Sequence, residues 1–312
     1  MQTILGSGGS IGIELAKSLK YFTDDIRLAS RNPKKVNETD QLFAADLTKR
    51  EEVFKAVSGS EIVYLTIGFE YSTKVWKQLW PPLMQNVIDA CIANKAKLVF
   101  FDNVYAIGGD FVSHITENSP ISPTSKKGEI RAQVDLVLLD TMNAGKINAI
   151  IARAPDFYGG NIDKSMLMTV IYKNLASDKK AQWLFNAKVK HSYIYAPDAG
   201  KATALLGNTP AAYNQIWNLP TDRKSLTPEQ WINLFAKEMG KSSHFQLIPA
   251  WMVRILGVFI PFMNELYEMR YQFDREYFFD SSKFENYFKY QPTRYQDGIK
   301  KIVAEFKNTL IQ

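Results

Sequence analysis

The first half of the chain alternates short apolar runs with longer stretches in which apolar residues recur at helical spacing. The short runs predict strands and the longer stretches predict helices. The expected strands cover residues 3–5, 25–29, 41–45, 61–67, 97–101 and 147–152. The expected helices cover residues 10–20, 48–57, 73–94 and 128–143. We expect Thr48 and Glu51 to cap the second helix, and Pro81-Pro82 to break the third.

A repeat of strand, helix and strand predicts an α/β fold with a parallel sheet that is doubly wound, with helices on both faces. The run 61–67 is apolar without alternation, as expected of a strand buried on both sides. Beyond residue 160 the repeat ends and aromatic residues become frequent. We therefore expect a first domain over residues 1–160, to which strands near 192–195 and 215–218 return, and a smaller, mostly helical lobe over 161–312.

Glycines recur directly after the first expected strand, at Gly6, Gly9 and Gly12, and Ser10 and Ile11 open the next helix. Glycine allows a tight turn and lets the backbone approach a ligand closely. The N-terminus of the following helix offers free N–H groups and a partial positive charge. This pattern between a strand and a helix predicts a dinucleotide pyrophosphate site.

The second expected strand ends at Ser30 and Arg31. An acidic residue at this place would bind the ribose of NAD, whereas an arginine suits the 2′-phosphate of NADP. The sequence therefore favours NADP, and NAD stays open as the alternative. In the other interpretation, Arg31 is a solvated residue before the Asn32-Pro33 turn.

The ends of the third and fourth expected strands supply further candidates for cofactor contact. Asp46 and Leu47 follow the third strand, where a carboxylate can accept a hydrogen bond from the adenine amino group. Asp46 equally suits the start of the next helix. The small residues around Thr66, Ile67 and Gly68 follow the fourth strand and leave room for a cofactor.

Composition excludes several classes of protein. The chain has 312 residues and a net charge of +6, but its 38 basic residues are scattered, which gives nucleic-acid binding little support. The single cysteine, Cys91, lies in an apolar helical stretch and indicates core packing. The three histidines lie far apart in the sequence, so we expect no metal site.

Targeting and membrane signals are weak. The first expected strand begins almost at Met1, which leaves no room for a signal peptide, and we expect a cytoplasmic protein. The apolar stretch 248–260 contains Arg254 and is shorter than the roughly 20 residues that a bilayer span needs. We expect it to form a helix packed in the second lobe, in preference to a membrane-surface contact.

Together with the glycine turn, three further stretches resemble the extended short-chain dehydrogenase/reductase superfamily, and within it the NAD-dependent epimerase/dehydratase family. These stretches are residues 116–123, 153–159 and 193–202. The resemblance implies a Rossmann-type NAD(P)-binding domain over 1–160, a substrate-binding lobe over 161–312, and contact between Pro155 and the cofactor. It also implies a homodimer formed through helices of the first domain.

The catalytic residues of the family are replaced in this chain. The family uses a serine or threonine after the fifth strand and a Tyr-x-x-x-Lys pair on the next helix. Here Asn103 stands at the serine position, and Lys127 and Arg131 stand at those of the pair. Arg131 keeps a positive charge that can donate to ribose hydroxyls. The resemblance places Tyr105 and Tyr158 near the pocket as alternative proton donors.

Two functions from different classes follow. In the first, the chain is an NADP-favouring oxidoreductase or epimerase-like enzyme for a small polar or sugar-like substrate. A neighbouring Arg131, a cationic nicotinamide and desolvation would then favour the neutral amine of Lys127 for acid–base work. In the second, the chain is a catalytically idle NAD(P)-binding sensor or assembly protein, and Lys127 and Arg131 are a solvated helical turn.

Overall fold

The computed structural model describes residues 1–160 and 165–309, which form two compact units. Unit 1 comprises residues 1–107, 120–154 and 197–219, and unit 2 the described remainder. The chain passes from unit 1 to unit 2 after Ala154. The expected boundary after residue 160 falls at 161–164, outside the described residues.

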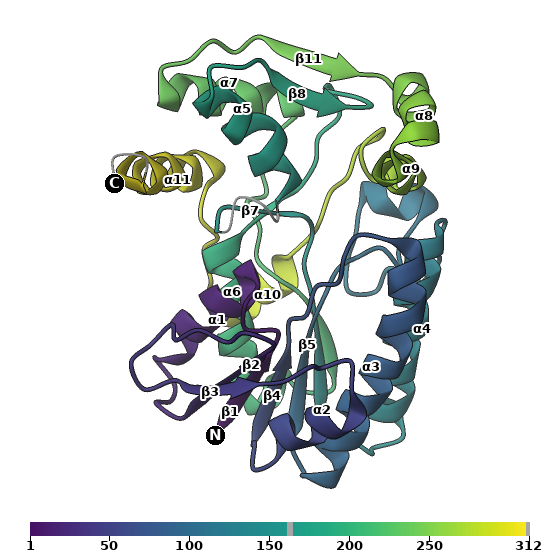
Figure 1. The fold of residues 1–312 in the computed structure, drawn as a ribbon, viewed down its shortest axis with the longest axis vertical. Coiled ribbons are helices and arrows are strands. Elements are labelled where there is room, and N and C mark those ends of the chain that lie inside the picture. The colour runs from purple at the N-terminus through teal and green to yellow at the C-terminus, as the bar shows by residue number, and fades with distance from the viewer. Residues whose placement is uncertain (161–164, 310–312) are drawn as a thin grey trace. The chain divides into compact units, whose positions relative to one another are not determined.

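Unit 1 contains a sheet of seven parallel strands in the order β10-β6-β5-β4-β1-β2-β3 (Figure 1). The strands are β1 (Gln2–Leu5), β2 (Ile26–Ser30), β3 (Gln41–Ala44), β4 (Ile62–Leu65), β5 (Lys97–Asp102), β6 (Ala149–Arg153) and β10 (Gln215–Asn218). This order confirms the Rossmann-type doubly wound sheet. It reverses direction between β1 and β4, which makes that point the switch where such sheets bind ligands.

Helices cover both faces of the sheet. One face carries α2 (Arg50–Val57), α3 (Thr73–Ala93) and α4 (Lys126–Asn143), whose apolar residues share one core cluster with the sheet. The other carries α1 (Ser10–Leu19) and α6 (Ala196–Gly207). These two helices touch closely, since a Cβ on Gly200 would lie 2.5 Å from the Glu14 carbonyl carbon.

Helix α3 is continuous through Pro81 and Pro82, so the expected break is absent. Two prolines remove two backbone donors, but burial of neighbouring side chains compensates for this loss. Trp80, Leu83 and Met84, directly beside the prolines, are all buried in the unit 1 core. Tertiary packing therefore overrides the local preference of the prolines.

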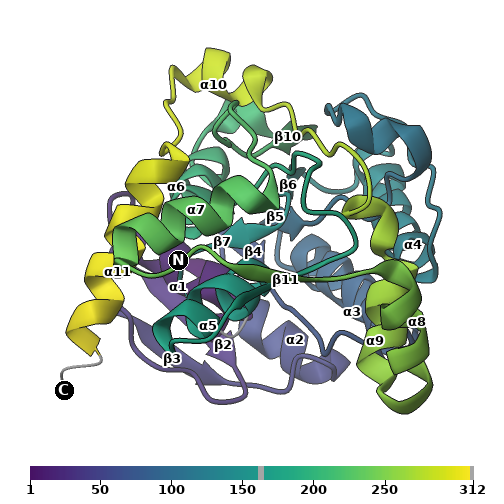
Figure 2. The ribbon, with the colours of Figure 1, turned by 90° about the horizontal axis from the view of Figure 1, so that it is seen from above.

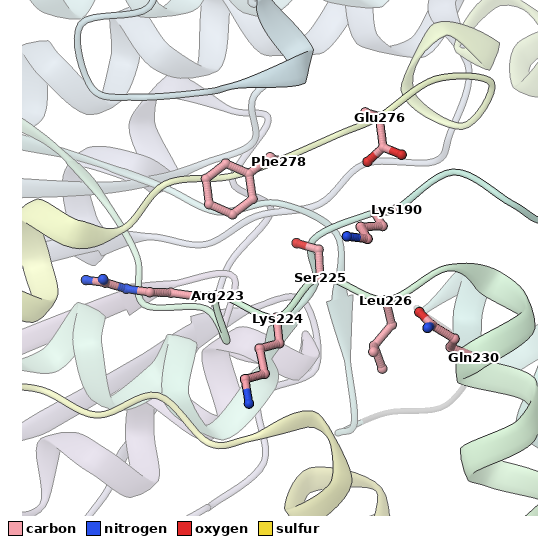
Figure 3. Close-up of a pocket in the computed structure, with 8 residues that line it drawn as sticks. All are labelled: Lys190, Arg223, Lys224, Ser225, Leu226, Gln230, Glu276 and Phe278. Atoms are coloured by element: carbon pink, nitrogen blue, oxygen red, sulfur yellow. The ribbon is translucent and has the colours of Figure 1, made fainter.

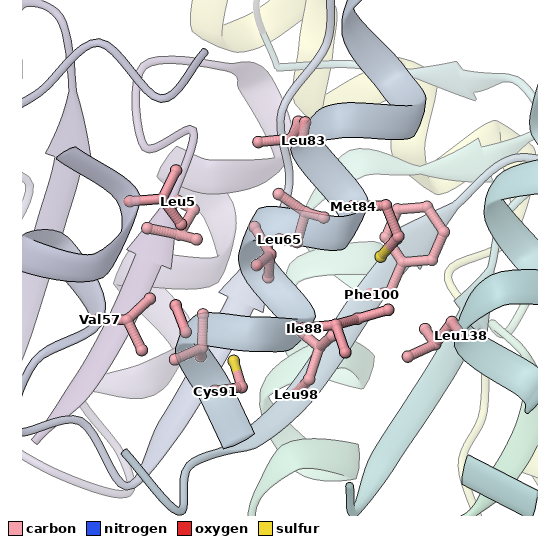
Figure 4. Packing of buried hydrophobic residues seen from close by; sticks show 14 of the residues in the cluster. Leu5, Val57, Leu65, Leu83, Met84, Ile88, Cys91, Leu98, Phe100 and Leu138 are labelled. Atoms are coloured by element: carbon pink, nitrogen blue, oxygen red, sulfur yellow. The ribbon is translucent and has the colours of Figure 1, made fainter. Parts of the chain in front are cut away.

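The core between the sheet and α2, α3 and α4 consists of aliphatic and aromatic side chains that interdigitate (Figure 4). Leu5, Leu65 and Phe100 point from three neighbouring strands toward α3. Alternate residues of the same strands face the opposite layer, and Tyr64 there meets Gly207 of α6 so closely that a Cβ would lie 2.3 Å from its hydroxyl.

Unit 2 is mostly helical, as expected. Its two small parallel sheets pair β7 (Phe157–Tyr158) with β9 (Ile194–Tyr195), and β8 (Ala181–Leu184) with β11 (Phe245–Ile248). Its helices include α5 (Lys173–Ala176), α7 (Pro228–Met239), α8 (Ala250–Phe259), α9 (Pro261–Glu268), α10 (Ser282–Phe288) and α11 (Tyr295–Thr309) (Figure 2). The expected return of 192–195 to the large sheet is wrong, because β9 pairs with β7; the strand at 215–218 does return, as β10.

The stretch 248–260 forms the end of β11 and all of α8. Among residues 1–160 and 165–309, no helix combines the length and the hydropathy that crossing a membrane requires. The helix packs on one side only: Val253 is buried, whereas Phe259 is 79% exposed. The expectation of a helix packed within the lobe is therefore met on one face alone.

The position of Cys91 gives a direct test of the core. Burial raises the pKa of its thiol to about 12, and the thiolate is the reactive form. We expect labelling of the native protein by a thiol reagent to be at least about a hundredfold slower than labelling in denaturant. Because the chain has a single cysteine, a colorimetric thiol assay needs no variant, and complete labelling of the native protein at the denatured rate would contradict this packing.

Candidate functional site

The glycine turn joins β1 to α1 at the switch point of the sheet. Gly6 has a φ of +101°, and a Cβ there would lie 2.8 Å from the Ile67 backbone nitrogen. A Cβ on Gly12 would lie 2.7 Å from the Gly6 carbonyl oxygen. These two glycines are therefore required by the close approach of β1, α1 and the end of β4.

The middle of the turn has a different environment. At Gly8 the nearest atom to an added Cβ is the Ser30 hydroxyl at 4.0 Å, and at Gly9 it is the Gly6 carbonyl at 3.7 Å. Gly9 is the N-cap of α1 and has no side chain to cover the first N–H groups. The backbone here is thus accessible to an anionic group, which the helix N-terminus favours.

Two buried hydroxyls flank this turn. Within residues 1–160 and 165–309, neither the Ser7 nor the Ser30 Oγ has a hydrogen-bond partner. A buried polar atom without a partner is costly, which makes each an indication of a ligand. Thr66 contributes less, because its hydroxyl donates to the carbonyls of Leu5 and Gly6 at 3.3 and 3.4 Å.

The end of β2 places Arg31 at the surface, where it is exposed. In the part of the chain that the structure describes, its guanidinium makes no hydrogen bond or ion pair, although its charge acts on Asp46. Arg31 therefore keeps all five donors for a ligand. Next to the turn, Gly68 has open space where a Cβ would stand, while the Leu47 side chain belongs to the core.

Asp46 organises the start of α2. Its carboxylate accepts hydrogen bonds from the Thr48 hydroxyl at 2.7 Å and from the Thr48 backbone N–H at 3.1 Å. These bonds, with the charges of Lys49 and Arg31, lower the pKa of Asp46. The expected capping box of Thr48 and Glu51 is wrong: the N-cap is Lys49, and Thr48 binds Asp46 instead. Within the chain, Asp46 therefore acts as a residue of the helix start, which is the second of the two roles considered for it.

The second part of the site is built around the first turn of α4. Ser125 caps this helix by accepting a hydrogen bond from the Gly128 N–H at 3.0 Å. A Cβ on Gly128 would lie 2.5 Å from the Tyr105 carbonyl oxygen, so the helix start packs against the loop after β5. In that loop the Asn103 Oδ1 accepts from the Tyr105 N–H at 2.9 Å.

Lys127 is fully buried in this region, and its ammonium nitrogen lies 4.7 Å from the centroid of the Tyr71 ring. Tyr105 lies edge-on to Tyr71 at 6.5 Å and is stacked on Trp76 at 5.9 Å. The structure therefore brings Lys127 and Tyr105 together within one aromatic group. Tyr71 and Trp76 were not found by sequence reasoning; Tyr71 precedes α3 in the loop after β4, the same sheet edge as the other candidates.

Arg131 lies one helical turn further along α4 and is directed elsewhere. Its guanidinium forms an ion pair with Asp102, and it lies 4.1 Å from the Trp80 ring centroid and 4.8 Å from that of Phe100. Both charged side chains of the pair are almost completely buried, at 1% and 0% exposed. This burial lowers the pKa of Arg131 to about 10. The solvated helical turn considered above does not exist, because Lys127 and Arg131 are both buried.

A second buried ion pair lies beside the first. Arg153, which is the register partner of Asp102 across β5 and β6, lies 3.6 Å from the Asp135 carboxylate of α4. Burial raises the pKa of Asp135, and the guanidinium groups of Arg153 and Arg131 oppose that rise. Four buried charges thus join α4 to the ends of two strands.

Comparison with known proteins identifies the group to which this chain belongs. The model of the NAD dependent epimerase/dehydratase family matches residues 3–219. The chain belongs to this family. No curated protein sequence matches the chain significantly.

Solved structures of several sugar-nucleotide enzymes share the fold of this family member. A dTDP-glucose 4,6-dehydratase from Streptomyces venezuelae, crystallised with NAD, has a TM-score of 0.80 at 15% identity, covering 98% of this chain and 97% of that one. The UDP-glucose 4-epimerase of Thermus thermophilus, in complex with NAD, has a TM-score of 0.77 at 16% identity, with 98% and 99% covered. The UDP-glucose 4-epimerase of Thermotoga maritima, with UDP-glucose, has a TM-score of 0.80 at 15% identity, with 99% and 100% covered.

The remaining candidates of this family member lie in unit 2, where Pro155 is the first residue after the crossing from unit 1. Tyr158 is not at a pocket mouth: it is fully buried, and its ring packs against Trp231 at 5.0 Å and Tyr295 at 5.8 Å. His191 is also buried, stacked on Tyr277 at 4.1 Å, as expected of a structural histidine. The described residues contain no cluster of groups able to hold a metal ion.

A pocket of about 590 Å³ opens in unit 2, and none of the predicted site residues lines it (Figure 3). It is lined by Lys190, Arg223, Lys224, Ser225, Leu226, Gln230, Glu276 and Phe278. Three of these residues are cationic, but Arg223 is already paired with Glu285 at 2.9 Å, and Glu276 brings a negative charge.

The Asp102–Arg131 pair can be tested by a double-mutant cycle. Arg131→Met leaves Asp102 buried without its partner, and we expect a loss of roughly 3–5 kcal/mol in the free energy of unfolding. Adding Asp102→Leu removes the isolated charge and should restore most of that loss. Urea unfolding followed by circular dichroism measures both variants and Asp102→Leu alone; a double variant whose loss equals the sum of the two single losses would show that the two side chains act independently.

Proposed function

We propose that this family member binds a nicotinamide dinucleotide at the glycine turn, with NADP favoured over NAD. The observation that carries the proposal is the pair of buried hydroxyls of Ser7 and Ser30, which have no hydrogen-bond partner among the described residues, beside the uncovered backbone of Gly8 and Gly9. Arg31 supports the choice of NADP, since it is exposed directly after β2 and its donors make no bond within the described part of the chain.

Different residues at the switch point would bind different parts of the cofactor. The first N–H groups of α1, at Ser10 and Ile11, would hold the pyrophosphate between Gly6, Gly9 and Gly12. Ser30 and Arg31 would hold the adenosine ribose and its 2′-phosphate, with the backbone of Asp46 and Leu47 beside the adenine. Thr66, Ile67 and Gly68 would line the path toward the nicotinamide, which accepts or supplies a hydride when it is bound.

For the chemical step we propose that Lys127 moves the proton at a substrate hydroxyl. Its amine is buried next to Tyr71 and Tyr105. The nitrogen lies over the face of the Tyr71 ring, which there takes the place of hydrating water. The Asn103 side-chain oxygen accepts a hydrogen bond from the Tyr105 N–H, and its NH2 group would donate to a substrate carbonyl or hydroxyl. The function is then that of an oxidoreductase or epimerase for a small polar or sugar-like substrate, and unit 2 is its substrate-binding lobe.

Arg131 favours a second candidate function. Its guanidinium is paired with Asp102, so Arg131 would not reach the nicotinamide ribose that the family's lysine contacts. A chain that binds the dinucleotide without turnover, as a sensor or an assembly protein, needs the glycine turn but not this contact. The two candidate functions agree on cofactor binding and differ only in catalysis.

Cofactor choice is tested by calorimetric titration with NADP and NAD, oxidised and reduced. We expect Arg31→Ala to weaken binding of NADP by about 10- to 100-fold and to change binding of NAD by less than about threefold, because the lost contact is to the 2′-phosphate. Lys34→Ala removes a neighbouring exposed charge and serves as the matched control. If the wild type binds neither nucleotide, the proposed cofactor site is wrong.

The role of Lys127 is tested by turnover of a panel of sugar nucleotides. Lys127→Met keeps the apolar stem, and we expect it to lower kcat by about 10²- to 10⁴-fold while leaving nucleotide affinity within a few-fold. The adjacent exposed Lys126→Met is the control and should keep its activity. Tight nucleotide binding without turnover by the wild type across the panel supports the idle protein, and unchanged turnover by Lys127→Met excludes the amine as the proton-transfer group.

A further inference from the structure

The α8–α9 hairpin exposes more large apolar side chains than any comparably short described segment. Between residues 251 and 262, six such side chains are at the surface: Trp251, Ile255, Val258, Phe259, Ile260 and Phe262. Val258 and Phe259, at the end of α8, are 78% and 79% exposed. A concentration of this kind marks a site of interaction with a protein or a membrane.

The exposed face cannot turn inward, because the opposite face of α8 is fixed against α9. Figures 1 and 2 show the two helices side by side. The Asn264 amide donates a hydrogen bond to the Gly257 carbonyl at 2.6 Å, and a Cβ on Gly257 would lie 2.1 Å from the Asn264 Oδ1. Val253 and Gly257, four positions apart, share the buried face of α8. The exposed residues Trp251, Ile255, Val258 and Phe259 lie one or two positions from them, and so on the other side of the helix.

Charge on the hairpin is segregated by position. From Pro249 to Asn264 the only charged residue is Arg254, which is exposed, and Arg270 is exposed just after α9. The two acidic residues, Glu265 and Glu268, are partly exposed and lie in the second half of α9, beyond the apolar stretch. Apolar residues, a tryptophan and flanking arginines are the composition of helices that lie at the surface of anionic bilayers.

The size of the exposed apolar surface favours a membrane over a second copy of this chain as the binding partner. A stable protein interface buries about 800 Å² on each partner, from some 20–30 residues. The hairpin offers six large apolar side chains within a 12-residue segment, which is too few for such an interface. A helix of ten residues is also only about 15 Å long, so α8 is too short to span a bilayer.

We propose that the α8–α9 hairpin docks this protein on an anionic lipid bilayer. Val258, Phe259, Ile260 and Phe262 enter the boundary between headgroups and acyl chains, and Arg254 contacts lipid phosphates. This docking is independent of the proposed cofactor and substrate.

Vesicle flotation with purified full-length protein tests the proposal. Vesicles of phosphatidylcholine mixed with phosphatidylglycerol should carry the protein, and vesicles of phosphatidylcholine alone should carry much less. We expect Val258→Asp/Phe259→Asp to lower binding at least tenfold, since both positions leave the buried core untouched. Arg254→Glu should remove the preference for the anionic lipid.

Two controls make the outcome decisive. Tyr287→Asp changes an exposed aromatic residue of α10 and should bind as the wild type does. Trp251 is the only exposed tryptophan of six, so protection of its fluorescence from acrylamide on adding vesicles reports contact at this hairpin. Absence of wild-type binding to anionic vesicles would overturn the proposal, as would binding that survives Val258→Asp/Phe259→Asp; self-association lost in that variant, without vesicle binding, would assign the surface to a second copy.

Discussion

Burial of the parallel sheet on both faces is the constraint on which the rest of unit 1 depends. The helices α1 and α6 cover one face and α2, α3 and α4 the other, and sheets of this kind bind ligands beyond the carboxyl ends of their strands. The glycine turn, Ser30, Thr66 and the loop after β5 all lie at those ends. Because the turn after β1 approaches Ile67, just beyond β4, too closely for any side chain on Gly6, the same packing that closes the core also leaves the backbone of the turn uncovered.

The buried charges of α4 follow from this arrangement. Asp102 and Arg153 end adjacent strands and point into an interior from which water is excluded, so each carboxylate or guanidinium requires a partner there. Arg131 and Asp135, one helical turn apart, supply those partners. Arg131 is thereby committed to the fold, and Lys127 remains as the cation beside Tyr71 and Tyr105. A single helix thus carries a structural charge network next to the residue to which we assign the chemistry.

The two units distribute apolar surface differently. Unit 1 encloses its apolar residues between layers, as at Cys91 and Leu98. Unit 2 buries a large aromatic core around Tyr158 and Trp231, but α8 keeps a second apolar face outside. Helix α8 is apolar on both sides. It buries one side against its neighbour α9, and a membrane or a protein partner is needed to remove the other side from water.

The sequence alone determined the parallel sheet, the glycine turn at its switch point and the family, because apolar runs and glycine spacing report local backbone requirements. It also indicated that Cys91 is a core residue. Tertiary structure decided what local patterns do not encode. Packing of Trp80 and Met84 kept α3 continuous through two prolines. The Thr48 hydroxyl donates to the Asp46 carboxylate and therefore does not cap α2 as expected. The partner of Arg131, the aromatic neighbours of Lys127 and the exposed face of α8 depend on residues distant in the chain, so only the folded arrangement of strands and helices fixes them.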